Sequence, residues 1–188
     1  MPRLPLTDSK ATYIPNPRFL TRFLPRLRVL SRRLSKKVKY SNNWLKAKKQ
    51  LSKLHAHIRH CREDFAHQLS TMIVKNHDII CVEGLDIANL LEKNTKSLSR
   101  SIADASWRAF LKCIAYKAKE RGKHFVETGR FFPSTQTCSC CGHRQKMGLG
   151  DREYRCSNCS IVIERDLNSA IIEKAAGMSV LKACGATP

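Results

Sequence analysis

The sequence predicts an α/β core that is interrupted by a small cysteine-rich module. Short apolar runs typical of strands alternate with longer segments in which apolar residues recur at helical spacing. Two Cys-x2-Cys pairs stand between the last predicted strand and the last predicted helix. With 188 residues, the chain is long enough for one core and one small module.

The N-terminal segment predicts a β-hairpin. Leu4–Thr7 and Ala11–Ile14 are short extended runs, a turn is expected at Asp8–Lys10, and Pro15 ends the second strand.

Two amphipathic helices are predicted over residues 18–38 and 44–75, and their apolar stripes can pack as an antiparallel pair. Pro25 must lie in the first turn of the first helix or kink it. Ser41, Asn42 or Asn43 can cap the second helix. The stripes are formed by Phe23, Leu27, Leu30, Leu34 and Val38 and by Leu51, Leu54, Ile58, Cys61, Phe65, Leu69 and Met72.

This pair of helices carries most of the positive charge. The net charge is +20, and between Asp8 and Glu63 the chain has sixteen Lys and Arg residues and no acidic residue. A stretch of one sign repels itself unless a polyanion neutralises it, so nucleic acid is the expected partner. A basic surface that only confers solubility, or a helix lying on a membrane, are the alternatives.

Asp78–Glu83 predicts a strand buried on both faces, because it contains four consecutive apolar residues before Gly84. Glu83 then lies at the carboxyl end of that strand, where open α/β sheets place their chemistry. A capping or surface role for Glu83 is equally compatible with the sequence.

The rest of the core follows in order. Residues 86–103 are expected to be loop-like, with a short helix near Ile87–Leu91. A helix is predicted from Asp104 to Arg121, with Trp107 as a core anchor, and it is followed by a strand at His124–Thr128. A last helix is predicted over Asp166–Ala176, ending at Gly177.

The cysteine-rich module has the spacing of a tetrahedral zinc site. Cys138 and Cys141 form one pair, fourteen residues follow, and Cys156 and Cys159 form the second. Unrelated buried cysteines or a disulfide are the alternatives. Cys140 falls between the ligands and is given no role. We therefore expect a zinc ribbon whose Zn²⁺ is structural, since four thiolates leave no open position.

Two carboxylates can bind Mg²⁺ together. Glu83 ends the buried strand, and Asp166 begins the last helix, whose N-terminus stabilises a negative charge. Divalent ions held by such groups activate a water and stabilise the leaving oxygen in phosphodiester cleavage. The ordinary explanation for Asp166 is stabilisation of the helix N-terminus alone.

Several ordered segments resemble the TnpB/OrfB family of insertion-sequence transposons. They are IPNPRFL (14–20), RRLSKK (32–37), SNNWLKAK (41–48), KLHAHIRHCREDFAHQLS (53–70), VEGL (82–85), SIADASW (101–107), GRFFPSTQTCSCCG (129–142) and RDLNSA (165–170). The resemblance covers nearly all of residues 4–176. It implies an RNase H/RuvC-like mixed sheet, three catalytic acids, Mg²⁺, and cleavage of DNA guided by RNA.

Residue by residue, the resemblance assigns Glu83 as the second acid and Asp166 as the third. The first acid belongs to a strand that would precede the N-terminal hairpin, and these 188 residues do not contain it. Asp8 is not a substitute, because it falls on the hairpin turn. We therefore expect a truncated family member whose RNase H-like sheet lacks its first strand. Loss of one metal ligand should remove several kcal/mol of transition-state stabilisation. Such a chain would be inactive as a nuclease.

The predicted domains are a partial nuclease domain (1–130) with its basic helical hairpin (18–75), an inserted zinc ribbon (131–163), a last helix (164–177) and a tail (178–188). The expected partners are DNA and a guide RNA. The alternative function is a non-catalytic zinc-ribbon protein that binds nucleic acid and regulates transposition. No signal-peptide or membrane-spanning pattern is found, so we expect a cytoplasmic protein associated with the nucleoid.

Overall fold

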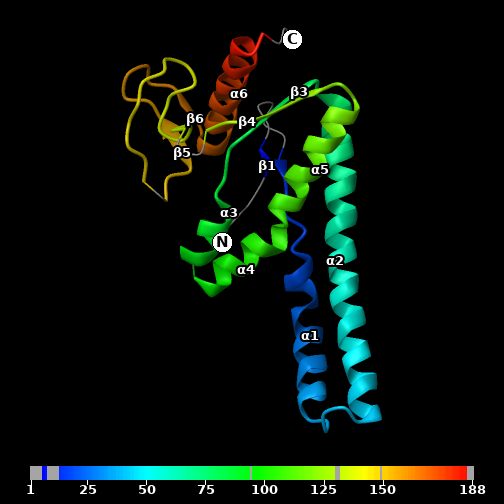
Figure 1. Cartoon of the computed structure of the whole chain (residues 1–188). Helices are drawn as coiled ribbons and strands as arrows, with labels where there is room; N and C mark the ends of the chain where they lie inside the picture. The colour runs from blue at the N-terminus through cyan, green and yellow to red at the C-terminus, as the bar shows by residue number, and fades with distance from the viewer. Residues whose placement is uncertain (1–5, 8–12, 94, 130–131, 149, 186–188) are drawn as a thin grey trace.

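The computed structural model describes residues 6–7, 13–93, 95–129, 132–148 and 150–185. Figure 1 shows how the helices and strands are arranged. In chain order the elements are β1 (Leu6–Thr7), β2 (Tyr13–Ile14), α1 (Phe19–Ser35), α2 (Asn42–Asn76), β3 (Ile79–Val82), α3 (Ile87–Lys93), α4 (Lys96–Ala105), α5 (Trp107–Glu120), β4 (His124–Glu127), β5 (Glu153–Arg155), β6 (Val162–Glu164) and α6 (Arg165–Ala183). This is a mixed α/β chain, as predicted. Among the described helices, none is long and apolar enough to cross a membrane.

The described strands form three separate two-stranded sheets: antiparallel β1–β2, parallel β3–β4 and antiparallel β5–β6. The β1–β2 pair confirms the N-terminal hairpin, although its turn at Asp8–Lys10 lies outside the described residues. Both β1 and β3 contact α6, but no strand of the described ranges joins them into one sheet.

Helix α2 packs against two different partners along its length of about 52 Å, at 1.5 Å per residue. Its first half buries Leu54 and Ile58 against Leu27 of α1, which confirms the predicted antiparallel pair. Its second half buries Ala66 and Val74 against α5. Figure 1 shows α1 beside one half of α2 and α5 beside the other.

The change of packing partner along α2 explains why some residues of the predicted apolar stripes are exposed. Met72 is 46% exposed, whereas Val74 is fully buried, because α5 meets a different face of α2 than α1 does. Val38 is 80% exposed, since α1 ends at Ser35. Pro25 lies in the second turn of α1, beyond the first turn that would best tolerate it.

Strands β3 and β4 are placed between helices. Ile80 faces the core made with α2 and α5, while its neighbour Cys81 touches Gly177 of α6. Ile80 is buried and the other residues of β3 are half-buried, so both faces of the predicted strand are covered by helices, although incompletely. Within the described residues, β3 pairs only with β4, and its other edge is not covered by a strand.

Gly177 does not end α6, which continues to Ala183. A Cβ at position 177 would lie 2.3 Å from the Sγ of Cys81, so glycine is required for close packing of the helix on β3. The predicted helix end was therefore wrong, because a glycine can serve packing as well as termination.

Residues 96–105 form helix α4, where a loop was expected. Thr95 caps it by accepting a hydrogen bond from Leu98 N at 3.4 Å. Ser106 then adopts a left-handed conformation (φ 50°) and separates α4 from α5. Asp104 accordingly belongs to α4, and α5 begins at Trp107.

Candidate functional site

The cysteine-rich module is built from two turns of the same geometry. Cys138 accepts a hydrogen bond from Gly142 N (3.0 Å), and its own N donates to His143 O (2.9 Å). Cys156 accepts from Ser160 N and donates to Ile161 O, each at 3.0 Å. The fourth residue after each of these cysteines has positive φ, 73° at Gly142 and 58° at Ser160.

The two turns bring four sulfurs together. Ligand atoms of Cys138, Cys141, Cys156 and Cys159 all lie within 4.8 Å of one another. The Sγ atoms of Cys138 and Cys159 are 3.7 Å apart, and those of Cys141 and Cys156 are 3.6 Å apart. A Zn–S length of about 2.3 Å in a tetrahedron gives sulfur separations of about 3.8 Å, so the four cysteines fit Zn²⁺.

The electrostatics of these thiols also favour a cation. A hydrogen bond with the side chain of Asn158 is the main cause that lowers the pKa of Cys141 to about 6. At Cys159, a backbone hydrogen bond from Ile161 lowers the pKa, but burial and the neighbouring thiols outweigh it and raise the pKa to about 12. Four clustered thiols therefore do not all ionise unless a positive charge lies among them.

Tyr154 and Asn168 hold the module together and attach it to the core. Tyr154 of β5 is fully buried and reaches the carbonyls of Gln136 and His143 at 3.1 and 3.2 Å. Asn168 of α6 is also fully buried. Its Nδ2 donates to Thr137 O (2.7 Å), and its Oδ1 accepts from Ser139 N (2.9 Å).

The two predicted acids lie at different places. Glu83 directly follows β3, as expected, and it is exposed. Partial desolvation and the nearby carboxylate of Glu173 raise the pKa of Glu83. Asp166 lies in the first turn of α6, with its Oδ1 3.7 Å from the Nε of Arg165.

Glu173 is an acidic residue that the sequence analysis missed. It is 7% exposed, accepts a hydrogen bond from Thr128 Oγ1, and its Oε1 has no hydrogen-bond partner among the described residues. Asp166 and Glu173 are seven residues apart and hence on one face of α6. Among the described side chains, only the four cysteines form a group of three or more His, Cys, Asp or Glu ligands that converge.

Asp104 is a second missed residue, and it fixes the basic hairpin to the core. Helix α1 has no cap of its own, because its N-cap residue Arg18 makes no side-chain cap hydrogen bond. Asp104 of α4 instead accepts hydrogen bonds from Leu20 N (2.9 Å) and Thr21 N (3.3 Å). The guanidinium of Arg62 on α2 forms an ion pair with the same carboxylate, with its Nη2 2.7 Å from Asp104 Oδ1.

The Asp104 side chain is only 1% exposed, so this contact joins α1, α2 and α4 in a buried position. Its burial requires the charged partner and the backbone donors that it has.

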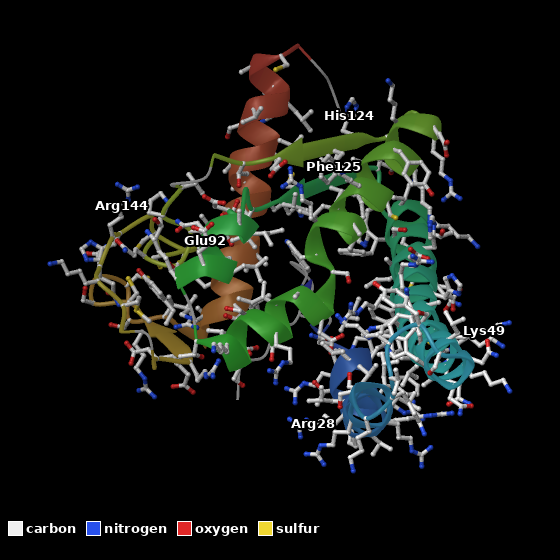
Figure 2. The ribbon with its side chains drawn as sticks, turned by 60° about the horizontal axis from the view of Figure 1, so that its bottom comes forward. Arg28, Lys49, Glu92, His124, Phe125 and Arg144 are labelled. Carbon is white, nitrogen blue, oxygen red and sulfur yellow. The ribbon has the colours of Figure 1, made fainter. Side chains whose placement is uncertain are left out.

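The outer surface of α1 and α2 is basic. Figure 2 shows nitrogen-tipped side chains around the hairpin, with the labelled Arg28 and Lys49 pointing outward on opposite sides. The exposed cations of this surface, named here the hairpin surface, are Arg22, Arg26, Arg28, Arg32, Arg33, Lys36, Lys37, Lys39, Lys46, Lys48, Lys49, Lys53 and Arg59.

Two family models match the chain. The model described as "Probable transposase" matches residues 5–94, and the one described as "Cas12f1-like, TNB domain" matches residues 107–172. The second match contains all four cysteines and Asp166, and the first contains the hairpin surface and Glu83.

Relatives from several organisms match along most of the chain. A Streptomyces pristinaespiralis protein named "Putative RNA-guided DNA endonuclease" is 39% identical over 181 residues, which are 96% of this chain and 44% of the relative. InsQ of Escherichia coli, which carries the same descriptive name, is 36% identical over 83% of this chain and 42% of its own length. The TnpB-like protein L79 of Acanthamoeba polyphaga mimivirus is 28% identical over 66% of this chain and 24% of the relative.

The chain thus spans less than half the length of the relatives it matches. The two matches contain all of the segments on which the sequence resemblance rested except SIADASW (101–107), of which residues 101–106 fall between them. The two family models lie in the same order along the chain as the hairpin and the cysteine-rich module. The chain belongs to the TnpB/OrfB family of transposon-encoded proteins.

Proposed function

We propose that this chain binds nucleic acid through the hairpin surface and a zinc-bound ribbon, and that its partners are DNA and a guide RNA. The observation that carries the proposal is the single-sign hairpin surface, which has thirteen exposed cations and is held in place by the buried Asp104. Phosphate groups are the ligands that neutralise such a surface. Relatives named as RNA-guided DNA endonucleases support both partners.

We further propose a RuvC-like core in which Glu83 and Asp166 are the acids that would hold Mg²⁺. Glu83 follows the carboxyl end of β3, and Asp166 begins α6, which packs on β3, so the two elements that carry these acids are in contact. Bound Mg²⁺ would supply charge neutralisation for phosphodiester cleavage. In this proposal the side chains of Glu83 and Asp166 provide its carboxylate ligands.

Residues 1–188 by themselves are proposed to bind without cutting, because they contain two of the three acids that the family uses. The separate β1–β2 and β3–β4 pairs support this, since a RuvC-like sheet requires a further strand between them. The proposed domains remain a partial nuclease domain, an inserted ribbon and a last helix, with that helix extended to Ala183.

The test combines binding and cleavage. The purified chain is mixed with Mg²⁺, a guide RNA and a matching target DNA, and gel mobility and product formation are recorded. We expect a shifted complex and intact DNA. Guide-dependent cuts by this chain would contradict the inactivity, and absence of any shift would contradict nucleic-acid binding.

A non-catalytic binding protein that regulates transposition is the second candidate. The observation favouring it is that the described carboxylates form no convergent group of three, and that Asp166 lies beside Arg165. Adding Mg²⁺ while monitoring thermal unfolding separates the two. Stabilisation that is lost in Glu83→Gln supports the nuclease-type site, and no Mg²⁺ effect supports the second candidate.

A further inference from the structure

The tip of the α1–α2 hairpin, residues 36–49, combines exposed aromatic and apolar side chains with a high density of lysine. Tyr40 and Val38 are each 80% exposed, and Leu45 is 50% exposed. Lys36, Lys37, Lys39, Lys46, Lys48 and Lys49 are all exposed in the same short segment. Single exposed apolar residues are ordinary, but this group lies together at the end of a basic hairpin.

The aromatic side chains of the tip are arranged in a fixed way. The rings of Tyr40 and Trp44 have centroids 5.5 Å apart and an interplanar angle of 51°. Lys48 Nζ lies 5.0 Å from the centroid of Trp44. Trp44 is half-buried beside these neighbours, while Tyr40 remains open to solvent.

The backbone of the tip is held by hydrogen bonds despite an unfavourable conformation. Tyr40 has φ 65°, a left-handed conformation that costs a tyrosine about 1 kcal/mol or more. Ser41 N and Ser41 Oγ both donate to Val38 O, at 3.2 and 2.8 Å, and Ser41 Oγ accepts from Trp44 N at 3.2 Å. The turn therefore presents Tyr40 in a pre-organised position.

We propose that this tip is a stacking site for unpaired bases of single-stranded nucleic acid, with Tyr40 as the platform and the surrounding lysines on the flanking phosphates. The proposal rests on the proposed nucleic-acid-binding function and deepens it. An exposed ring within a basic surface is the combination by which proteins bind single strands without reading sequence. A paired duplex hides its base faces, so it can use the lysines but not Tyr40.

The side chains of the tip also indicate which kind of ligand it binds. Between Asp8 and Glu63 the chain has no acidic residue, so the tip is complementary to a polyanion. Phosphate charge explains the lysines, and only a ligand with flat apolar faces also explains the exposed tyrosine.

The test compares a 12-nucleotide oligo(dT) with a 12-base-pair duplex, using the full 188-residue chain. Tyr40→Asn removes the ring and tolerates positive φ, so the fold is retained. We expect about a 10-fold weaker affinity for oligo(dT), corresponding to one lost stacking contact, and less than a twofold change for the duplex. Tyr40→Phe should keep the wild-type affinity. Tyr116→Ala, which removes an exposed ring on α5, is the matched control and should have no effect.

A spectroscopic readout reports the contact directly. Binding of oligo(dT) beside Tyr40 should quench the fluorescence of Trp44. In Trp44→Phe, this quenching should be lost, and the fluorescence of the other tryptophan, Trp107, should remain. Equal losses on both oligonucleotides in Tyr40→Asn, or no loss on either, would overturn the stacking site while leaving nucleic-acid binding intact.

Other outcomes separate this inference from the proposed function. Wild-type binding to neither oligonucleotide would overturn both. A loss of binding to phosphatidylglycerol vesicles in Tyr40→Asn, with oligo(dT) affinity unchanged, would assign the tip to a membrane surface and overturn the inference.

Discussion

The side-chain amide of Asn168 is hydrogen-bonded to the backbone on both sides of Cys138. Its donor meets Thr137 O at 2.7 Å, and its acceptor meets Ser139 N at 2.9 Å. One buried side chain of α6 therefore fixes the first cysteine turn to the same helix that carries Asp166. Asn168 therefore connects the geometry of the four-cysteine cluster with the position of α6.

Asn168→Ala should destabilise the chain by about 2 kcal/mol, because it leaves the partly buried Ser139 N–H and Thr137 carbonyl without their partner. Urea unfolding with zinc present measures the change. Ser169→Ala is the matched control on the same helix. Its hydroxyl is buried without a partner among the described residues, so its removal should be neutral or stabilising. Equal losses in both variants would contradict the role of Asn168.

Metal analysis of protein purified without chelator should give about one zinc per chain. Cys156→Ser should lose most of this zinc, because Cys156 is one of the four convergent ligands. Cys140→Ser is the control, since Cys140 is exposed and lies outside the convergent group. Full zinc in Cys156→Ser, or its loss in Cys140→Ser, would refute the ligand assignment.

Asp104→Asn should cost about 3 kcal/mol in stability, because the Arg62 guanidinium then lacks its buried counter-charge and the N-terminus of α1 loses a charged acceptor. Glu63→Gln is the control, because it breaks an ion pair with Arg59 in which both side chains are more than half exposed. This change should alter the free energy of unfolding by less than about 1 kcal/mol. Thermal unfolding compares the two. Similar small shifts would show that the Asp104 contact does not hold the hairpin.

Glu83→Gln should stabilise the metal-free protein at neutral pH. The pKa of Glu83 is raised in the folded state by desolvation and by Glu173, so the contribution of Glu83 to stability is present at pH values below its unfolded pKa and is lost as pH rises through the folded pKa. The gain should therefore be seen at pH 7 and vanish near pH 4. Urea midpoints at both pH values measure it, with Glu92→Gln on α3 as an exposed control. A gain that is larger at pH 4 would contradict this assignment.

The elements that the sequence predicted well are those with strong local signals. The convergence of the four cysteines follows from their spacing alone, and the hairpin follows from apolar periodicity together with a Ser41 cap that accepts from Trp44 N. Gly177 was misread as a helix end because its reason is a tertiary contact with Cys81, which local sequence does not contain. Helix α4 was missed because its residues are polar and its buried contact, Asp104, meets partners 42 and 84 residues away.

The missed site residues share the same cause. Asn168 and Glu173 are polar residues of α6, and local sequence gives no reason to place them inside. Both are buried, since Asn168 binds the ribbon backbone and Glu173 binds Thr128. Asn168 is contained in RDLNSA, so the family motif was the available signal. Glu173 had none.

The most direct test of the account is the salt dependence of DNA binding by the hairpin surface. The wild-type chain is compared with a variant in which Arg28, Arg32, Lys49 and Lys53 are replaced by Gln, and with a control in which Arg108, Lys112, Lys119 and Arg121 are replaced. These control residues are exposed cations outside the hairpin. The affinity of the wild-type chain for DNA should fall steeply with salt. In the hairpin variant, the slope of log affinity against log salt concentration should be smaller by about 3 to 4, since each lost phosphate contact removes about 0.9. The control variant should keep nearly the wild-type slope. A flat wild-type slope, or equal effects of the two variants, would contradict nucleic-acid binding by the hairpin surface.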